Sequence, residues 1–259
     1  MIPPAFWYTP SPTLPAQLLR PLSWLYRFGA TLHGAWRAHH AYRPHVPLIS
    51  VGNLTVGGSG KTPVTAWLAQ HFQTSHNVAI VMRGYGSSVR TPIRVEASRH
   101  TVTNVGDEPL MLARQLPNVT IWAARDKADG VRAAEASGAT LILLDDGFQR
   151  RDLTPTVNIL IIGKQGVGNG LCLPAGPLRE PTSSARRADV IIVVNQPATR
   201  ENLTPTARLT YTLDHTDATQ LKNTPVVAFA GLANPTFFFH ELREAGVNVV
   251  ETIPFPDHH

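Results

Sequence analysis

The fold of this chain is decided by the stretch PLISVGNLTVGGSGKTP, residues 47–63. A short β-rich run ends there in a glycine-dense turn, and Lys61 and Thr62 follow the turn directly. The next residues, TPVTAWLAQHF, predict a helix. A strand, a glycine loop, a Lys-Thr pair and a helix, in this order, are typical of a phosphate-binding P-loop.

The residue types of this loop suit the binding of phosphate. Glycine lacks a Cβ atom, so backbone N–H groups can turn inward around phosphate oxygens, and the helix N-terminus adds partial positive charge. We expect Lys61 to reach the β- and γ-phosphates of a nucleotide and the Thr62 hydroxyl to bind Mg²⁺. The nucleotide-binding residues predicted from this stretch are Thr55, Val56, Gly57, Gly58, Ser59, Gly60, Lys61 and Thr62.

One position of the loop departs from the usual pattern, G-x-x-x-x-G-K-[ST]. Counting back from Gly60 places Thr55, and not glycine, in the first position. The alternative interpretation is a glycine turn that only joins a strand to a helix. The strand and the helix lie where a P-loop needs them, which favours a nucleotide-phosphate site.

An acidic motif, DDGFQ, follows the hydrophobic run LILL of residues 141–144. A buried strand that ends in aspartate is the Walker B arrangement, which places a carboxylate beside the Mg²⁺ of a P-loop. Asp-Gly is also a common turn, but a P-loop upstream favours the functional interpretation. Asp145 and Asp146 are therefore candidate metal ligands.

A second acidic motif is GDEP, residues 106–109, directly before the predicted helix LMLARQL. We expect Asp107 as the N-cap and Pro109 in the first turn, and helix initiation alone would explain this pattern. The functional interpretation is an acidic pair, Asp107 and Glu108, in the active site. A carboxylate can take a proton from a hydroxyl or bind Mg²⁺, and phosphoryl transfer requires both.

The remaining pattern predicts a doubly wound, mostly parallel α/β sheet of the P-loop NTPase type. Hydrophobic strands alternate with helices and are expected to be buried on both faces; they are residues 77–82, 119–122, 141–144, 157–162 and 188–195. Arg83 follows the second of the predicted strands, where open sheets bind ligands, and is either a phosphate contact or a solvated loop residue. We predict three parts: an arm and helix (1–45), a kinase core (46–222) and the start of a smaller α/β domain (223–259).

The N-terminal part predicts a basic amphipathic helix over residues 15–42. Leucine and aromatic side chains recur at helical spacing and are interleaved with arginines. Arginine interrupts the stretch too often for a membrane span, and the pattern is not that of a signal peptide. Such a helix suits the surface of a membrane, and packing on the domain core is the alternative.

Composition limits the classes of partner that the chain is expected to bind. The 259 residues are 43% hydrophobic and carry a formal charge of +5, with far more arginine than lysine. Guanidinium groups suit phosphate or anionic lipid. The sequence contains no nucleic-acid-binding motif, so nucleic acid is not a predicted partner. A single cysteine, Cys172, excludes an internal disulfide framework.

These motifs together resemble the tetraacyldisaccharide 4′-kinases of lipid A biosynthesis, over nearly the whole chain. The family shares the threonine at the first P-loop position. The segments that carry the resemblance are Phe6-Trp7-Tyr8, PLSWLY (21–26), SVGNLTVGGSGKTP (50–63), RGYG (83–86), GDEP (106–109), LDDGFQ (144–149), LPAGPLREP (173–181), FAGLANP (229–235) and FPDHH (255–259).

The resemblance implies transfer of the ATP γ-phosphate, with Mg²⁺, to the 4′-hydroxyl of a tetraacyldisaccharide 1-phosphate, which yields lipid IVA at the cytoplasmic face of the bacterial inner membrane. It implies that Asp107 and His258 act as the base on the sugar hydroxyl, with Lys61 as a further catalytic residue. The implied metal ligands are Thr62, Glu108, Asp145 and Asp146. The implied substrate contacts are Arg83, Tyr85, Arg125, Gln149 and Arg179. No obligatory protein partner is expected.

Family members usually continue well beyond the Asp-His motif, so the resemblance also predicts that this chain lacks the C-terminal part of the second domain. Two other classes stay open. A nucleotide-dependent switch or metallochaperone-type regulator would hydrolyse nucleotide without a small-molecule acceptor. A non-catalytic remnant would bind ATP or membrane without turnover.

Overall fold

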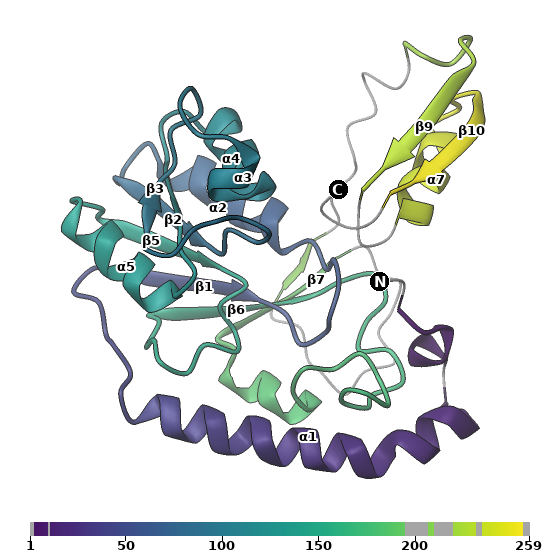
Figure 1. The fold of residues 1–259 in the computed structure, drawn as a ribbon, viewed down its shortest axis with the longest axis horizontal. Helices are drawn as coiled ribbons and strands as arrows, with labels where there is room; N and C mark the ends of the chain where they lie inside the picture. Colours follow the sequence, from purple (N-terminus) through teal and green to yellow (C-terminus); the bar gives the residue numbers. More distant parts are fainter. Residues whose placement is uncertain (1–2, 10, 195–206, 210–219, 232–234, 256–259) are drawn as a thin grey trace. The chain divides into compact units, whose positions relative to one another are not determined.

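The computed structural model describes residues 3–9, 11–194, 207–209, 220–231 and 235–255. It divides into two compact units (Figure 1). The larger unit spans Ala5–Leu209, and the smaller one contains the described residues after position 219.

The larger unit is built on one eight-stranded sheet with the order β3-β4-β2-β5-β1-β6-β7-β8. All neighbouring pairs are parallel except β3 and β4. The doubly wound, mostly parallel sheet predicted from the sequence is therefore confirmed. The strands are β1 (Leu48–Gly52), β2 (Val78–Met82), β3 (Ile93–Arg94), β4 (Thr120–Ala123), β5 (Leu141–Asp145), β6 (Val157–Ile162), β7 (Val190–Val194) and β8 (Ala207–Leu209).

Helices cover both faces of this sheet, which explains why its central strands are hydrophobic without alternation. On one face, α2 (Lys61–Phe72) and α4 (Asp107–Gln115) pack with Leu141 and Leu143 of β5. On the other face, α5 (Lys127–Ala136) packs with Ile142 and Leu144 of the same strand. The two-residue period of a strand thus divides β5 between two cores.

The topology brings the P-loop and the DDG motif together. β1 pairs with β5 so that Val51 lies opposite Asp145, and both strands end at the same edge of the sheet. The chain leaves β1 into the glycine loop and leaves β5 into Asp146 and Gly147. This edge, at the carboxyl ends of the strands, is where open α/β sheets bind ligands.

Two helices begin elsewhere than expected. The N-cap of α4 is Gly106 and not Asp107, because the short helix α3 (Val102–Val105) ends at Gly106, whose φ of 94° suits glycine. Asp107 is then the first helical residue. The alanine-rich stretch of residues 130–137 also predicts a helix. The helix α5 begins earlier, at Lys127, because the Asp126 carboxylate accepts hydrogen bonds from the backbone N–H groups of Ala128 and Asp129.

The N-terminal helix α1 (Leu14–Ala38) follows a 3-10 turn, η1 (Ala5–Tyr8), and runs along one side of the larger unit (Figure 1). Its small side chains face the protein: Ala16 and Ser23 are buried, and the Ser23 hydroxyl donates to the carbonyl oxygen of Cys172 at 2.7 Å. Eight of its large apolar side chains face solvent, each more than 50% exposed: Leu14, Leu18, Leu22, Trp24, Leu25, Phe28, Leu32 and Trp36. Packing on the core is thus excluded for this face. Within the described residues, no helix is both long and apolar enough to cross a membrane.

The smaller unit contains one strand–helix–strand piece. Its strands β9 (Val226–Ala230) and β10 (Val249–Pro254) pair in parallel, and α7 (Pro235–Glu244) connects them. Ala228, Ala230 and Phe239 form its buried cluster.

The larger unit also contains a 3-10 helix, η2 (Thr182–Arg187), before β7.

Candidate active site

The glycine loop presents free backbone donors at the start of α2. Gly57 and Gly60 have φ values of 94° and 82°, which glycine adopts without strain. Among the residues that the structure describes, no oxygen accepts a hydrogen bond from the amides of residues 57–60. The Ser59 hydroxyl is also buried without a hydrogen-bond partner in the described part of the chain. Donors gathered at a helix N-terminus form an anion site.

Asp145 is held against α2 by two threonines. The Thr62 hydroxyl lies 3.2 Å from its Oδ2 atom, and the Thr65 hydroxyl lies 3.1 Å from its Oδ1 atom. Asp145 is only 5% exposed. Burial raises the pKa of Asp145, and the nearby charges of Lys127 and Lys61 oppose this rise. A carboxylate beside the P-loop threonine has the composition of a Mg²⁺ site in this class of fold.

Asp146 engages the cations of the site. Its carboxylate lies 3.6 Å from Lys61 Nζ, and the Arg179 guanidinium donates to both oxygens at 3.0 Å. Burial raises the pKa of Asp146, but the charges of Lys127, Lys61 and Arg179 outweigh it and hold the pKa well below its usual range. The carboxylate is therefore ionised and keeps Lys61 and Arg179 at the mouth of the loop.

Residues after β5 and β6 complete the wall of the loop. The amide of Val56 donates to the carbonyl oxygen of Pro177 at 2.9 Å, and the amide of Arg179 donates to that of Leu54 at 2.7 Å. The Gln149 side chain donates to the carbonyl oxygen of Asn53 at 2.7 Å. These bonds bring Gln149 and Arg179 to the P-loop. Both residues are among the five predicted substrate contacts.

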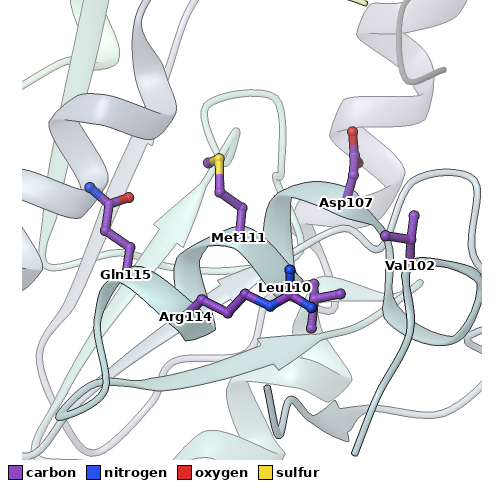
Figure 2. Close-up of a pocket in the computed structure, with 6 residues that line it drawn as sticks. All are labelled: Val102, Asp107, Leu110, Met111, Arg114 and Gln115. Atoms are coloured by element: carbon purple, nitrogen blue, oxygen red, sulfur yellow. The ribbon is translucent and has the colours of Figure 1, made fainter. Parts of the chain in front are cut away.

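Asp107 lies at the N-terminus of α4 and lines a separate pocket of about 450 Å³ (Figure 2). The backbone at Gly106 packs against the Gly84–Tyr85 loop, where a Cβ would lie 3.1 Å from the carbonyl oxygen of Tyr85. Asp107 and Glu108 thus start their helix beside the RGYG loop. The pocket shares no residue with the P-loop; its lining is Val102, Asp107, Leu110, Met111, Arg114 and Gln115.

Two further predicted contacts, Arg83 and Arg125, lie together in a pocket of about 380 Å³. Arg83 directly follows β2 and Arg125 follows β4, so neighbouring strands carry both to the same edge of the sheet. Tyr85, 58% exposed, lies on the loop after Arg83. His258, the predicted partner of Asp107, lies outside the described residues.

The comparison with known proteins identifies the family. Residues 15–259 match the family model described as tetraacyldisaccharide-1-P 4′-kinase. The chain belongs to this 4′-kinase family. The predicted family is confirmed, and the predicted activity, a kinase of lipid A biosynthesis, is the one that gives the family its name.

Individual members of the 4′-kinase family match along most of their length. The chain is 40% identical to the tetraacyldisaccharide 4′-kinase of Gluconobacter oxydans (strain 621H), over 99% of this chain and 79% of the relative. It is 39% identical to that of Rhodopseudomonas palustris (strain BisB5), over 99% and 77%. LpxK from Aquifex aeolicus, solved in complex with ATP, superposes with a TM-score of 0.77 at 31% identity, covering 94% of this chain and 82% of that one.

In this 4′-kinase, the metal site would have few protein ligands. Among the described residues, no three His, Cys, Asp or Glu side chains converge as a metal cluster. Mg²⁺ in nucleotide sites takes one or two protein ligands and completes its shell with phosphate oxygens and water. The Thr62 hydroxyl beside Asp145 fits this donor set.

Sequence reasoning missed two residues of the kinase site. Thr65, fully buried, shares one face of α2 with Thr62, and this i, i+3 spacing was the available signal. Lys127, 6% exposed, donates to the carbonyl oxygens of both Asp145 and Asp146 at 2.7 Å. The sequence gives little indication that Lys127 is buried, since a lysine at a helix start is usually solvated.

Proposed function

We propose that this chain transfers the γ-phosphate of ATP to the 4′-hydroxyl of a tetraacyldisaccharide 1-phosphate and so forms lipid IVA. Membership of the 4′-kinase family supports this reaction. The observation that carries it is the arrangement at the carboxyl edge of β1 and β5. The loop amides of residues 57–60, which have no acceptor among the described residues, lie at the same edge as Lys61, Thr62 and Asp145.

Mg²⁺ would be held by Thr62 and Asp145. Asp146, predicted as a further ligand, is proposed instead to hold Lys61 and Arg179, because its carboxylate pairs with both of them. When bound, Mg²⁺ neutralises charge on the β- and γ-phosphates. Lys61 would share that task, and its ion pair with Asp146 keeps the ammonium near the loop before nucleotide arrives. Phosphoryl transfer depends on such charge neutralisation and alignment more than on covalent chemistry.

Asp107 is proposed as the base that takes the proton of the sugar hydroxyl, together with His258. The position of Asp107 supports this role, because the first residue of a helix lies in the positive field of the helix dipole, which favours the carboxylate. Glu108, next to it, is proposed as a further Mg²⁺ ligand in the closed enzyme. The proposed parts of the chain are the arm and helix (1–45), the kinase core (46–222) and the second domain from 223 onward.

The acceptor is proposed to contact Arg83, Tyr85, Arg125, Gln149 and Arg179. These five side chains lie on loops at the carboxyl edge of the sheet, and three of them carry guanidinium groups. Guanidinium binds phosphate bidentately, which suits a phosphorylated sugar.

The exposed apolar face of α1 is proposed to lie in the headgroup region at the cytoplasmic face of the inner membrane. Its leucine and aromatic side chains are exposed in the described structure, and arginines accompany them. Amphipathic helices of this kind bind the surface of anionic membranes. An acceptor whose acyl chains stay in the bilayer would then meet the enzyme without leaving the membrane.

The test is transfer of radiolabelled γ-phosphate from ATP to tetraacyldisaccharide 1-phosphate in detergent micelles. A labelled lipid that forms with this chain and is lost with Lys61→Ala supports the kinase. Hydrolysis of ATP without labelled lipid would indicate a nucleotide switch. ATP binding without any turnover would indicate a non-catalytic chain.

A further inference from the structure

Ser23 is a buried polar side chain in the middle of α1. It is 3% exposed, whereas its neighbours Leu22 and Trp24 are 51% and 61% exposed. Its hydroxyl donates to the carbonyl oxygen of Cys172 at 2.7 Å, while the Leu19 carbonyl oxygen, the usual acceptor one turn earlier in a helix, lies at 3.5 Å. An alanine would pack as closely, so it is the bond to another segment that explains the hydroxyl.

The same hydroxyl accepts a second hydrogen bond from outside the helix. The backbone amide of Ala175 donates to it at 3.2 Å, so Ser23 bonds to both ends of the turn of residues 172–175. Ala175 is fully buried, and without the hydroxyl its N–H group would have no acceptor among the described residues. A buried donor left without an acceptor is costly, so the turn would shift to find one.

The N-terminal 3-10 turn η1 holds the 172–175 turn from a second side. The indole N–H of Trp7 donates to the carbonyl oxygen of Pro174 at 3.0 Å. The Asn169 side chain donates to the carbonyl oxygen of Ala175 at 2.9 Å, and the Asn169 amide donates to that of Trp7 at 2.7 Å. Hydrogen bonds from both N-terminal elements therefore fix the position of this turn.

The 172–175 turn leads directly into the wall of the P-loop. Residues 177–179 follow it after a single glycine and pair with the chain that enters the glycine loop, where Thr55 and Leu178 form an antiparallel bridge. Leu178 is fully buried, so this pairing has little freedom to adjust by itself. A displacement of the turn would therefore move the segment that lies against the P-loop.

This pairing also sets the position of Arg179. The Arg179 amide donates to the carbonyl oxygen of Leu54 at 2.7 Å, and its guanidinium donates to both oxygens of Asp146 at 3.0 Å. Asp146 in turn lies 3.6 Å from Lys61 Nζ. Fixed donors are what a phosphate site requires, because their orientation is then settled before the ligand binds. Few residues separate the buried hydroxyl of α1 from these cations.

We propose that Ser23 is a positioning residue of the ATP site. Through the 172–175 turn, it holds the P-loop wall and Arg179 in the arrangement that binds phosphate. The inference rests on the proposed function, because it takes the P-loop as the ATP site. Without the hydroxyl, the loop adopts the binding arrangement in a smaller fraction of molecules, and the apparent affinity for ATP falls in proportion to that fraction. The two faces of α1 then have different roles, the outer one toward the membrane and the inner one toward the nucleotide.

The test compares Ser23→Ala with the unmodified chain by isothermal titration calorimetry with ATP and Mg²⁺ in detergent micelles. We expect the Kd for ATP to rise about fivefold, which is about 1 kcal/mol, as for the loss of one buried hydrogen bond. The KM for the lipid acceptor and the partitioning onto phosphatidylglycerol vesicles should not change. Thr31→Ala is the matched control, because it removes an exposed hydroxyl of α1 that bonds to the Arg27 carbonyl oxygen within the same helix. It should change none of these three values.

Trp7→Phe tests the same turn from η1. It removes the indole N–H that donates to Pro174 and leaves α1 unaltered. The Kd for ATP should rise in this variant too, and the variant decides the question if Ser23→Ala does not fold. An unchanged Kd in Trp7→Phe would contradict the role given to the turn.

Three further results would overturn the inference. An unchanged Kd for ATP in Ser23→Ala, with a lower free energy of unfolding, would give Ser23 a packing role only. An unchanged Kd with weaker vesicle binding would mean that the hydroxyl orients α1 at the membrane. If the unmodified chain binds no ATP, the proposed function and this inference fail together. A chain that binds ATP but forms no labelled lipid would overturn the proposed function alone, and the Kd values would still decide the role of Ser23.

Discussion

The Nζ atom of Lys127 lies 2.7 Å from the backbone carbonyl oxygen of Asp145, at the end of β5. The same ammonium donates to the carbonyl oxygen of Asp146, also at 2.7 Å. Asp146 has a φ of 51°, which residues other than glycine rarely adopt. One buried cation therefore holds the turn that directs the two carboxylates in different directions, Asp145 toward Thr62 and Asp146 toward Lys61 and Arg179.

Lys127→Met is expected to destabilise the larger unit. It would leave two carbonyl oxygens at the end of β5 without their buried donor, at a cost of about 2 kcal/mol or more in the free energy of unfolding. Chemical denaturation monitored by far-UV circular dichroism measures this cost. Lys222→Met, which removes an exposed lysine, serves as the control and should change the free energy by less than about 0.5 kcal/mol. Equal stability of both variants would contradict the role given to Lys127.

Asp146→Asn is expected to weaken the acid sensitivity of the fold. The pKa of Asp146 is lower in the folded state than in the unfolded state, so its stabilising contribution is complete above about pH 4 and is lost as the pH falls below that value. Between pH 5 and pH 3 the unmodified chain should lose about 1 kcal/mol more than Asp146→Asn. The comparison uses urea unfolding at both pH values. Asp129→Asn, which removes an exposed carboxylate, should behave like the unmodified chain.

Gly163→Ala is expected to weaken ATP binding. Gly163 follows β6 and packs on the P-loop, so that a Cβ there would lie 2.9 Å from Ser59 Cα and 3.2 Å from the Ser59 carbonyl oxygen. Both neighbours are backbone atoms, so the loop itself has to move. Isothermal titration calorimetry should show a loss of affinity of about tenfold. Gly29→Ala, where a Cβ would meet nothing within 4 Å, should bind ATP normally, and normal binding by Gly163→Ala would show that the loop tolerates the shift.

Leu25→Ser combined with Phe28→Ser is expected to weaken membrane binding without lowering stability. Both side chains are exposed, at 68% and 66%, so the folded protein in water gains little from them. Burial of two such side chains in a membrane is worth roughly 2 kcal/mol or more, which is at least tenfold in partitioning. Vesicle flotation measures the partitioning and thermal unfolding measures the stability. Val250→Ser, an exposed apolar residue of β10, is the matched control. A drop in melting temperature with unchanged flotation would assign the α1 face to protein packing.

The sequence by itself determined the parts of the molecule that depend on local rules. The glycine turn before Lys61 and the hydrophobic run before Asp145 predicted a P-loop and a Walker B motif, because each depends on neighbouring residues. Parallel strands end at one edge, so the meeting of these two motifs also followed from the order of elements. The register of Val51 with Asp145 agrees with that expectation.

Only the tertiary structure decided which way the apolar face of α1 points and which segments line the pocket that contains Arg83 and Arg125. Helical periodicity predicts that a helix has an apolar face, but not what covers it. Here Ala16 and Ser23 pack inward and the larger side chains stay outside. Likewise, Lys127 and Arg150 show no local signature, since their partners are distant in sequence and meet them only after the sheet has brought the loops together. Contacts of this kind depend on the path of the whole chain and on burial, which no short stretch of sequence encodes.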